Sequence, residues 1–169
     1  CYKFFKRVDR RLFKAKNDCF GRVMLDDALA GIETLRVIPV RGKFTDQLND
    51  EDSALIRSKK LDVLIRFGFR ILKGEILQSA RLGVWSLHHG DNAVNRGGPP
   101  AFWEVAMGEP VSGVTLQVLS ADLDAGTVID KAFVRTDRTS FNRNQNAVYW
   151  AGIELFCDAL RWAAEGQPL

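Results

Sequence analysis

Two short apolar runs, at residues 61–67 and at Val84–His88, constrain the fold more than any other part of the sequence. Each has the length of a strand, and a stretch with helical character at residues 73–78 separates them. Runs that are apolar on both faces are typical of parallel sheets covered by helices. The order strand, helix, strand therefore predicts an α/β protein in which residues 61–67 form a strand buried on both faces.

The other elements are predicted from periodicity and from end signals. Strands are expected at residues 34–40, 112–119 and 127–135, and the last two predict some antiparallel pairing. Helices are expected at residues 1–15, 26–29, 46–59, 102–107 and 146–164. We expect the four tryptophans in the core, and a single domain over residues 1–169, because no linker or repeat interrupts the chain.

Histidine chemistry in this chain is confined to one place, because the two histidines, His88 and His89, are adjacent. An imidazole can serve as a general acid or base near neutral pH, and a carboxylate such as Asp124 can orient it. The ends of parallel strands are where such groups meet. A structural histidine and an aspartate that forms a turn explain the same residues, so the residues alone leave both alternatives open.

The order of motifs around His88 resembles that of the folate-dependent formyltransferases. Their pattern is Gly-x-x-Asn-x-His, a loop, Arg-Gly, an apolar helix, Gly-Val-Thr, an apolar strand and Leu/Val-Asp-x-Gly. The same order runs here through Gly83, His88, Arg96-Gly97, Phe102-Trp103, Gly113-Val114-Thr115 and Leu123-Asp124-Ala125-Gly126. The resemblance implies a Rossmann-type three-layer α/β fold with a mostly parallel sheet and antiparallel late strands.

The resemblance also implies a role for each matching residue. His88 and Asp124 match the catalytic pair. The loop that holds the pterin ring of formyltetrahydrofolate is matched by Phe69, Arg70, Ile71 and Leu72, and the second loop of that pocket by Leu119, Ser120, Ala121 and Asp122. The loop beside the reaction centre, where an acceptor is expected, contains Asn92, Arg96 and Gly97. The implied formyl donor is 10-formyltetrahydrofolate, without a metal.

Two departures from the family pattern bear on the chemistry. Ser86 stands where the family has its catalytic asparagine, and we count it as a catalytic candidate although a hydroxyl is shorter than an amide. Loss of an oxyanion donor costs on the order of 10²–10³ in rate. Residues 90–95 replace the usual Ser-Leu-Leu-Pro, which predicts a different acceptor.

The start of the chain also departs from the family. The opening strand and Gly-rich loop of the family have no counterpart before residue 1, so we expect the first βαβ portion to be missing. A parallel sheet without that portion has an apolar edge. We expect a missing segment of the chain or a second copy to cover it.

Other classes of site are disfavoured. Adjacent side chains on a strand point to opposite faces, so His88 and His89 do not share a metal ion. The cysteines lack zinc-type spacing and are expected to be reduced in the cytoplasm. Eight basic residues lie within the first 22 positions, and we interpret them as a solvated helix face rather than a nucleic-acid surface. No apolar run reaches the roughly 20 residues of a membrane span.

We therefore expect an enzyme that transfers a formyl group from 10-formyltetrahydrofolate to the primary amine of a small molecule, with an amino sugar as the specific candidate. Two alternatives stay open. One is a formyltransferase-like module that keeps its ligand pocket without efficient turnover, which Ser86 motivates. The other is a hydrolytic deformylase, in which water replaces the amine.

Overall fold

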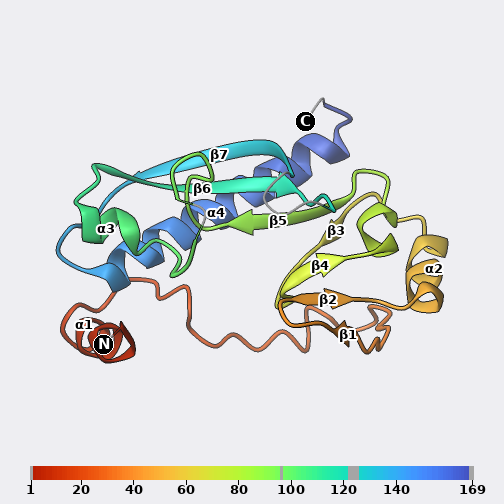
Figure 1. Ribbon diagram of the computed structural model, residues 1–169, viewed down its shortest axis with the longest axis horizontal. Helices are drawn as coiled ribbons and strands as arrows, with labels where there is room; N and C mark the ends of the chain where they lie inside the picture. The colour runs from red at the N-terminus through yellow and green to blue at the C-terminus, as the bar shows by residue number, and fades with distance from the viewer. Residues whose placement is uncertain (1, 96, 122–125, 168–169) are drawn as a thin grey trace. The chain divides into compact units, whose positions relative to one another are not determined.

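The computed structural model describes residues 2–95, 97–121 and 126–167 and combines helices with strands (Figure 1). Its helices are α1 (Tyr2–Leu12), α2 (Asp50–Ser58), α3 (Trp103–Met107) and α4 (Phe141–Ala164), with a 3₁₀ helix η1 (Glu75–Gln78). Its strands are β1 (Val40–Arg41), β2 (Thr45–Gln47), β3 (Leu64–Ile65), β4 (Ile71–Lys73), β5 (Val84–His88), β6 (Val111–Val118) and β7 (Thr127–Arg135). The predicted α/β class is confirmed.

The chain forms two compact units. The first contains Cys1–Phe20, Leu87–Gln117 and Thr127–Leu169, and the second contains Gly21–Ser86 and Val118–Gly126. Strand β5 passes from the second unit into the first, so Ser86 belongs to one unit and His88 to the other.

The first unit is built on helix α4, which packs along strand β7 (Figure 1). Strand β6 lies beside β7 in the sheet order. Ser140 caps α4, because its side chain accepts a hydrogen bond from the backbone N–H of Arg143. The core of the unit is apolar and contains Val114, Leu116, Phe141, Val148 and Ala159, all of them almost fully buried.

Helix α1 meets α4 through a buried carboxylate. Asp9 is 5% exposed, and its Oδ2 accepts from Ser140 Oγ at 3.1 Å and from the backbone N–H of Asn142 at 2.6 Å. A carboxylate at a helix N-terminus is favoured by the helix dipole. Two apolar residues of α1, Phe4 and Leu12, are 74% and 70% exposed.

The second unit contains short strands around an apolar cluster. Strand β2 pairs antiparallel with β1 and parallel with β4. Strand β3 pairs parallel with the start of β5, with Leu64 opposite Val84. The cluster consists of Leu48, Leu72, Ile76, Leu77 and Val84. Parallel pairing between β3 and β5, with η1 in the connection between them, is the arrangement that the two apolar runs predict.

Helix α2 begins directly after its N-cap residue, Asn49. The side chain of Asn49 accepts from the backbone N–H of Asp52 at 2.7 Å, as expected for an N-cap. We expect Asn49→Ala to lower the free energy of unfolding by about 1 kcal/mol, because one backbone N–H of the first helical turn loses its acceptor. Asn49→Ser, which keeps a capping oxygen, should recover most of this loss. Urea unfolding checks the prediction, and an unchanged midpoint in Asn49→Ala would contradict it.

Several predicted elements were wrong in their bounds or in their kind. Residues 34–40 form no strand except at Val40, because this segment finds a partner strand only there. Residues 26–29 form turns rather than a helix. The first residues of the helix predicted at 46–59 belong to strand β2 instead. Lys73, the first residue of the helix predicted at 73–78, is the last residue of strand β4.

Burial explains the remaining corrections. The strand predicted at 61–67 is reduced to β3 and is not buried on both faces, since Ile65 is 43% and Phe67 70% exposed. Helix α4 starts at Phe141 rather than at residue 146, because Ser140 caps it. Only one tryptophan, Trp85, is buried among the four, which include Trp103, Trp150 and Trp162. Among the described residues, no helix is both long enough and apolar enough to cross a membrane.

Candidate functional site

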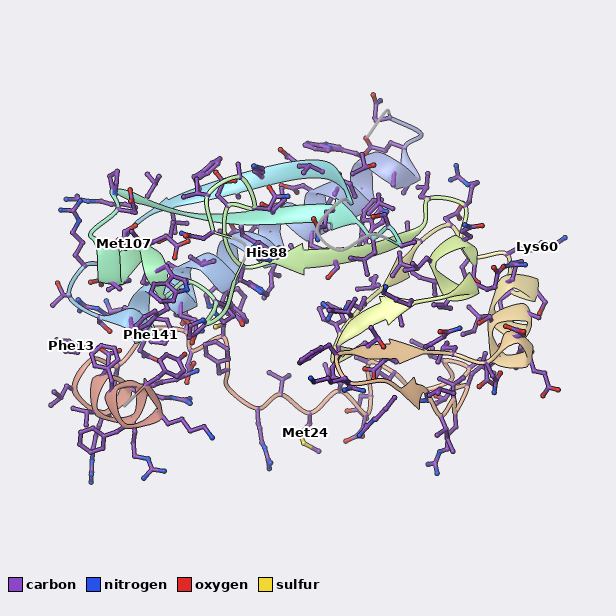
Figure 2. All side chains as sticks on the ribbon, in the orientation of Figure 1. Phe13, Met24, Lys60, His88, Met107 and Phe141 are labelled. Atoms are coloured by element: carbon purple, nitrogen blue, oxygen red, sulfur yellow. The ribbon has the colours of Figure 1, made fainter. Side chains whose placement is uncertain are left out.

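His88 ends strand β5, where the chain enters the loop that leads to α3 (Figure 2). Its side chain is half-buried, and its Nε2 lies 2.8 Å from the carbonyl oxygen of Asn95. A carbonyl oxygen only accepts hydrogen bonds, so Nε2 carries the proton in this contact. The lone pair of the neutral ring is then on Nδ1, which is the basic nitrogen.

The loop after His88 is tied down within the first unit. The backbone N–H of Asn95 donates to the carbonyl oxygen of Asp91 at 2.8 Å, and the Asn95 side chain donates to Glu104 Oε1 at 3.1 Å. Lys131 Nζ lies 2.5 Å from the Asp91 carboxylate, and this hydrogen bond lowers the pKa of Asp91. The carbonyl group that contacts His88 is therefore held in place from several sides.

Gly90 is the residue that lets this loop come close to the histidine. A Cβ at this position would lie 3.1 Å from His88 Nε2 and 3.2 Å from the carbonyl oxygen of Asn95. Thr115 Oγ1 donates to the carbonyl oxygen of Gly90 at 3.0 Å and accepts from the backbone N–H of Asn92 at 3.4 Å. A side chain at residue 90 would thus press on the His88 contact itself.

His89 has a different environment from His88. Its ring stacks on that of Tyr149 in α4, with the ring centroids 3.7 Å apart and the planes 8° from parallel. Burial, with a smaller contribution from His88, lowers the pKa of His89 from 6.5 to about 4. His89 is therefore neutral near pH 7 and packs as an aromatic group.

In the second unit, Arg70 fastens the predicted folate-side loop to strand β2. Its Nε and Nη2 donate to Asp46 Oδ1 at 3.0 and 2.7 Å, and its backbone N–H donates to Asp46 Oδ2 at 2.8 Å. The guanidinium also donates to the carbonyl oxygens of Gly42, Lys43 and Thr45. These bonds hold the pKa of Asp46 below its ordinary value. The Arg70 side chain is thus occupied in holding the loop.

An apolar cavity of about 190 Å³ lies beside this loop. It is lined by Val37, Leu48, Ile56, Leu64, Ile65, Arg66, Phe69, Leu72, Ile76 and Val84. Leu119 packs against the same apolar cluster, and its N–H donates to the carbonyl oxygen of Val84 at 2.7 Å. The structure therefore brings together Phe69, Leu72 and Leu119, which come from both of the segments that the sequence assigned to folate.

Arg66 is the charged residue of this cavity, and sequence reasoning missed it. Its Nη1 donates to Ser86 Oγ at 3.2 Å, and its Nη2 donates to the carbonyl oxygens of Phe69 and Arg70. Burial lowers the pKa of Arg66. The signal was present in the sequence, because an arginine inside an apolar run needs hydrogen-bond partners when it is buried.

The remaining predicted residues have varied positions. Ser86 is buried, Ile71 lies in β4, and the exposed residues are Gly97, Ser120 and Ala121. Three predicted residues lie outside the described part of the chain, namely Arg96, Asp122 and Asp124. In the part that the structure describes, no group of three histidine, cysteine or acidic side chains is placed to hold a metal ion.

Two curated relatives illustrate what the sequence is similar to. The methionyl-tRNA formyltransferase of Chlorobium phaeovibrioides is 33% identical over 117 residues, which are 66% of this chain and 35% of that protein. That of Chlorobium chlorochromatii is 36% identical over 85 residues, which are 50% of this chain and 27% of that protein. The chain thus spans about a third or less of the length of these relatives. No protein-family model matches it.

Solved structures agree with the sequence matches. A formyltetrahydrofolate deformylase from Pseudomonas syringae is 24% identical with a TM-score of 0.62, covering 70% of this chain and 41% of that one. HypX from Aquifex aeolicus, solved with tetrahydrofolic acid, is 24% identical with a TM-score of 0.55, covering 70% of this chain and 20% of that one. At these identities the likeness shows the fold alone. The sequence matches place the chain in the formyltransferase family.

Proposed function

We propose that the protein transfers a formyl group from 10-formyltetrahydrofolate to the primary amine of a small molecule. The observation that carries this proposal is the state of His88. Its Nε2–H is held by the carbonyl oxygen of Asn95 at 2.8 Å, which leaves Nδ1 as the basic nitrogen. A histidine with one ring nitrogen fixed as a donor keeps the other nitrogen to take up and return a proton, as formyl transfer requires.

The proposed reaction has a simple balance. The amine nitrogen attacks the formyl carbon, a tetrahedral intermediate forms, and the bond between that carbon and N10 of the folate breaks. His88 accepts the proton that the amine loses and returns it to N10, so the products are a formamide and tetrahydrofolate. We assign to Asp124 the stabilisation of the charged form of the His88 ring, and to Ser86 a hydrogen bond to the oxyanion.

For the donor, we propose that the pterin ring enters the apolar cavity of the second unit. Its volume of about 190 Å³ is below the roughly 300–1,000 Å³ that enclose whole drug-sized ligands, so it fits one ring system rather than an entire folate. Main-chain groups of residues 69–72 and 119–122 would bind the polar edge of the ring. For the acceptor, with an amino sugar as the specific candidate, we assign Asn92, Arg96 and Gly97.

Release of tetrahydrofolate tests the proposal. The purified protein, incubated with 10-formyltetrahydrofolate, should release tetrahydrofolate when an amino-sugar nucleotide is added. Methionyl-tRNA belongs in the same panel of acceptors, because the curated relatives are named for it. Release with methionyl-tRNA alone would contradict the small-molecule acceptor. No release with any acceptor, although tetrahydrofolate binds, would favour the module that keeps its pocket without turnover.

A further inference from the structure

The guanidinium of Arg66 is directed at two segments of the second unit. Its Nη2 donates to the carbonyl oxygens of Phe69 and Arg70, and its Nη1 donates to Ser86 Oγ at 3.2 Å. Among the described residues, its buried Nε has no hydrogen-bond partner. The Arg66 guanidinium therefore links the folate-side loop to strand β5 at Ser86.

The contact with Arg66 changes what Ser86 can do. Ser86 is 3% exposed, and its oxygen accepts a hydrogen bond from a cation. One lone pair of the oxygen is therefore occupied, and the hydroxyl proton is left to donate. Hydrogen bonds to charged groups are stronger than neutral ones, and linked hydrogen bonds polarise one another, so the O–H of Ser86 becomes a better donor.

We propose that Arg66 is a positioning residue for formyl transfer, which fixes and polarises the Ser86 hydroxyl as an oxyanion donor and holds the loop of residues 67–70 beside it. This inference rests on the proposed function. It gives a physical reason why a serine suffices at this position. An asparagine amide donates without help from a cation, whereas a serine hydroxyl depends on the guanidinium to set its direction.

A combination of substitutions tests this dependence. Arg66→Met should lower kcat on the order of 10²-fold, the size expected when an oxyanion donor is lost, and Ser86→Ala should lower it similarly. The double variant should be little worse than either single one, because both remove the same donor. Ser86→Asn should recover much of the kcat that Arg66→Met loses, because an amide needs no polarising partner.

The matched control is Arg81→Met, which removes an exposed arginine from the same unit, where it pairs with exposed Asp62. This variant should keep the wild-type kcat. If Arg66→Met lowers kcat equally with serine and with asparagine at position 86, the loss does not pass through Ser86 and the inference is overturned. A change confined to KM would also overturn it, because an oxyanion donor acts in the transition state.

Thermal unfolding without substrate separates this inference from the proposed function. If Arg66 and Ser86 are coupled, the Tm shifts of Arg66→Met and Ser86→Ala should not add in the double variant. Additive shifts would overturn the inference, whatever the turnover. Coupled shifts in a protein that never releases tetrahydrofolate would support the Arg66–Ser86 contact and overturn the proposed function instead.

Discussion

Replacing His88 by alanine is expected to lower kcat for formyl transfer by on the order of 10²–10⁴-fold, the usual contribution of a positioned general acid or base. The physical reason is the geometry at the end of β5. The Nε2–H of His88 donates to the carbonyl oxygen of Asn95, with Nε2 and that oxygen 2.8 Å apart. The other ring nitrogen is therefore available to carry the proton from the amine to the folate. Steady-state release of tetrahydrofolate measures the loss.

The adjacent histidine supplies the control. His89→Phe keeps a ring that can stack on Tyr149, and it removes a group that is neutral near pH 7. Its kcat should stay close to that of the wild type. Activity that survives His88→Ala, or an equal loss in His89→Phe, would contradict the assignment of proton transfer to His88.

Protonation of His89 is expected to contribute about 3 kcal/mol to the destabilisation of its unit between pH 7 and pH 4. The pKa of His89 lies near 4 in the folded chain, against 6.5 for an ordinary histidine. At about 1.36 kcal/mol for each unit of pKa, a difference of this size corresponds to about 3 kcal/mol. The cause is burial against Tyr149, which disfavours the charged ring.

The direction of this effect follows from proton binding. Above pH 6.5 the ring is neutral in both states, and the full stability is present. As the pH falls from 6.5 towards 4, the unfolded chain binds a proton that the folded chain refuses, so stability is lost. Denaturant unfolding of the wild type and of His89→Phe at several pH values measures this contribution as their difference. An identical pH dependence in both proteins would contradict it.

Elements with strong local signals could be predicted from the sequence. Strand β5 has the predicted bounds, and so does β7. In both strands the local pattern of apolar and polar residues is enough to specify a strand. The strand expected at residues 34–40 failed because strand propensity does not provide a pairing partner: Ile38 is 80% exposed, and pairing begins only at Val40.

Contacts between distant residues were beyond sequence reasoning. The amphipathic pattern of α1 is real, but the burial of Asp9 depends on Ser140 and Asn142, more than 100 residues away along the chain. The same holds for the candidate site. His88 was identified from its motif, whereas the acceptor that fixes its ring is a main-chain carbonyl group, which no residue type reveals. Arg66 stands inside an apolar run, which is a signal in the sequence, but its partners could not be identified because two of them are main-chain carbonyl oxygens.

The fate of the formyl carbon tests the central claim most directly. The protein would be incubated with 10-formyltetrahydrofolate labelled with ¹³C in the formyl group, together with the amino-sugar nucleotide that best stimulates tetrahydrofolate release. We predict that the label appears in a formamide on the sugar and that His88→Ala prevents its transfer. Label recovered as free formate would show that water is the acceptor, and label that stays on the folate would show that no transfer occurs. Either result would contradict the account.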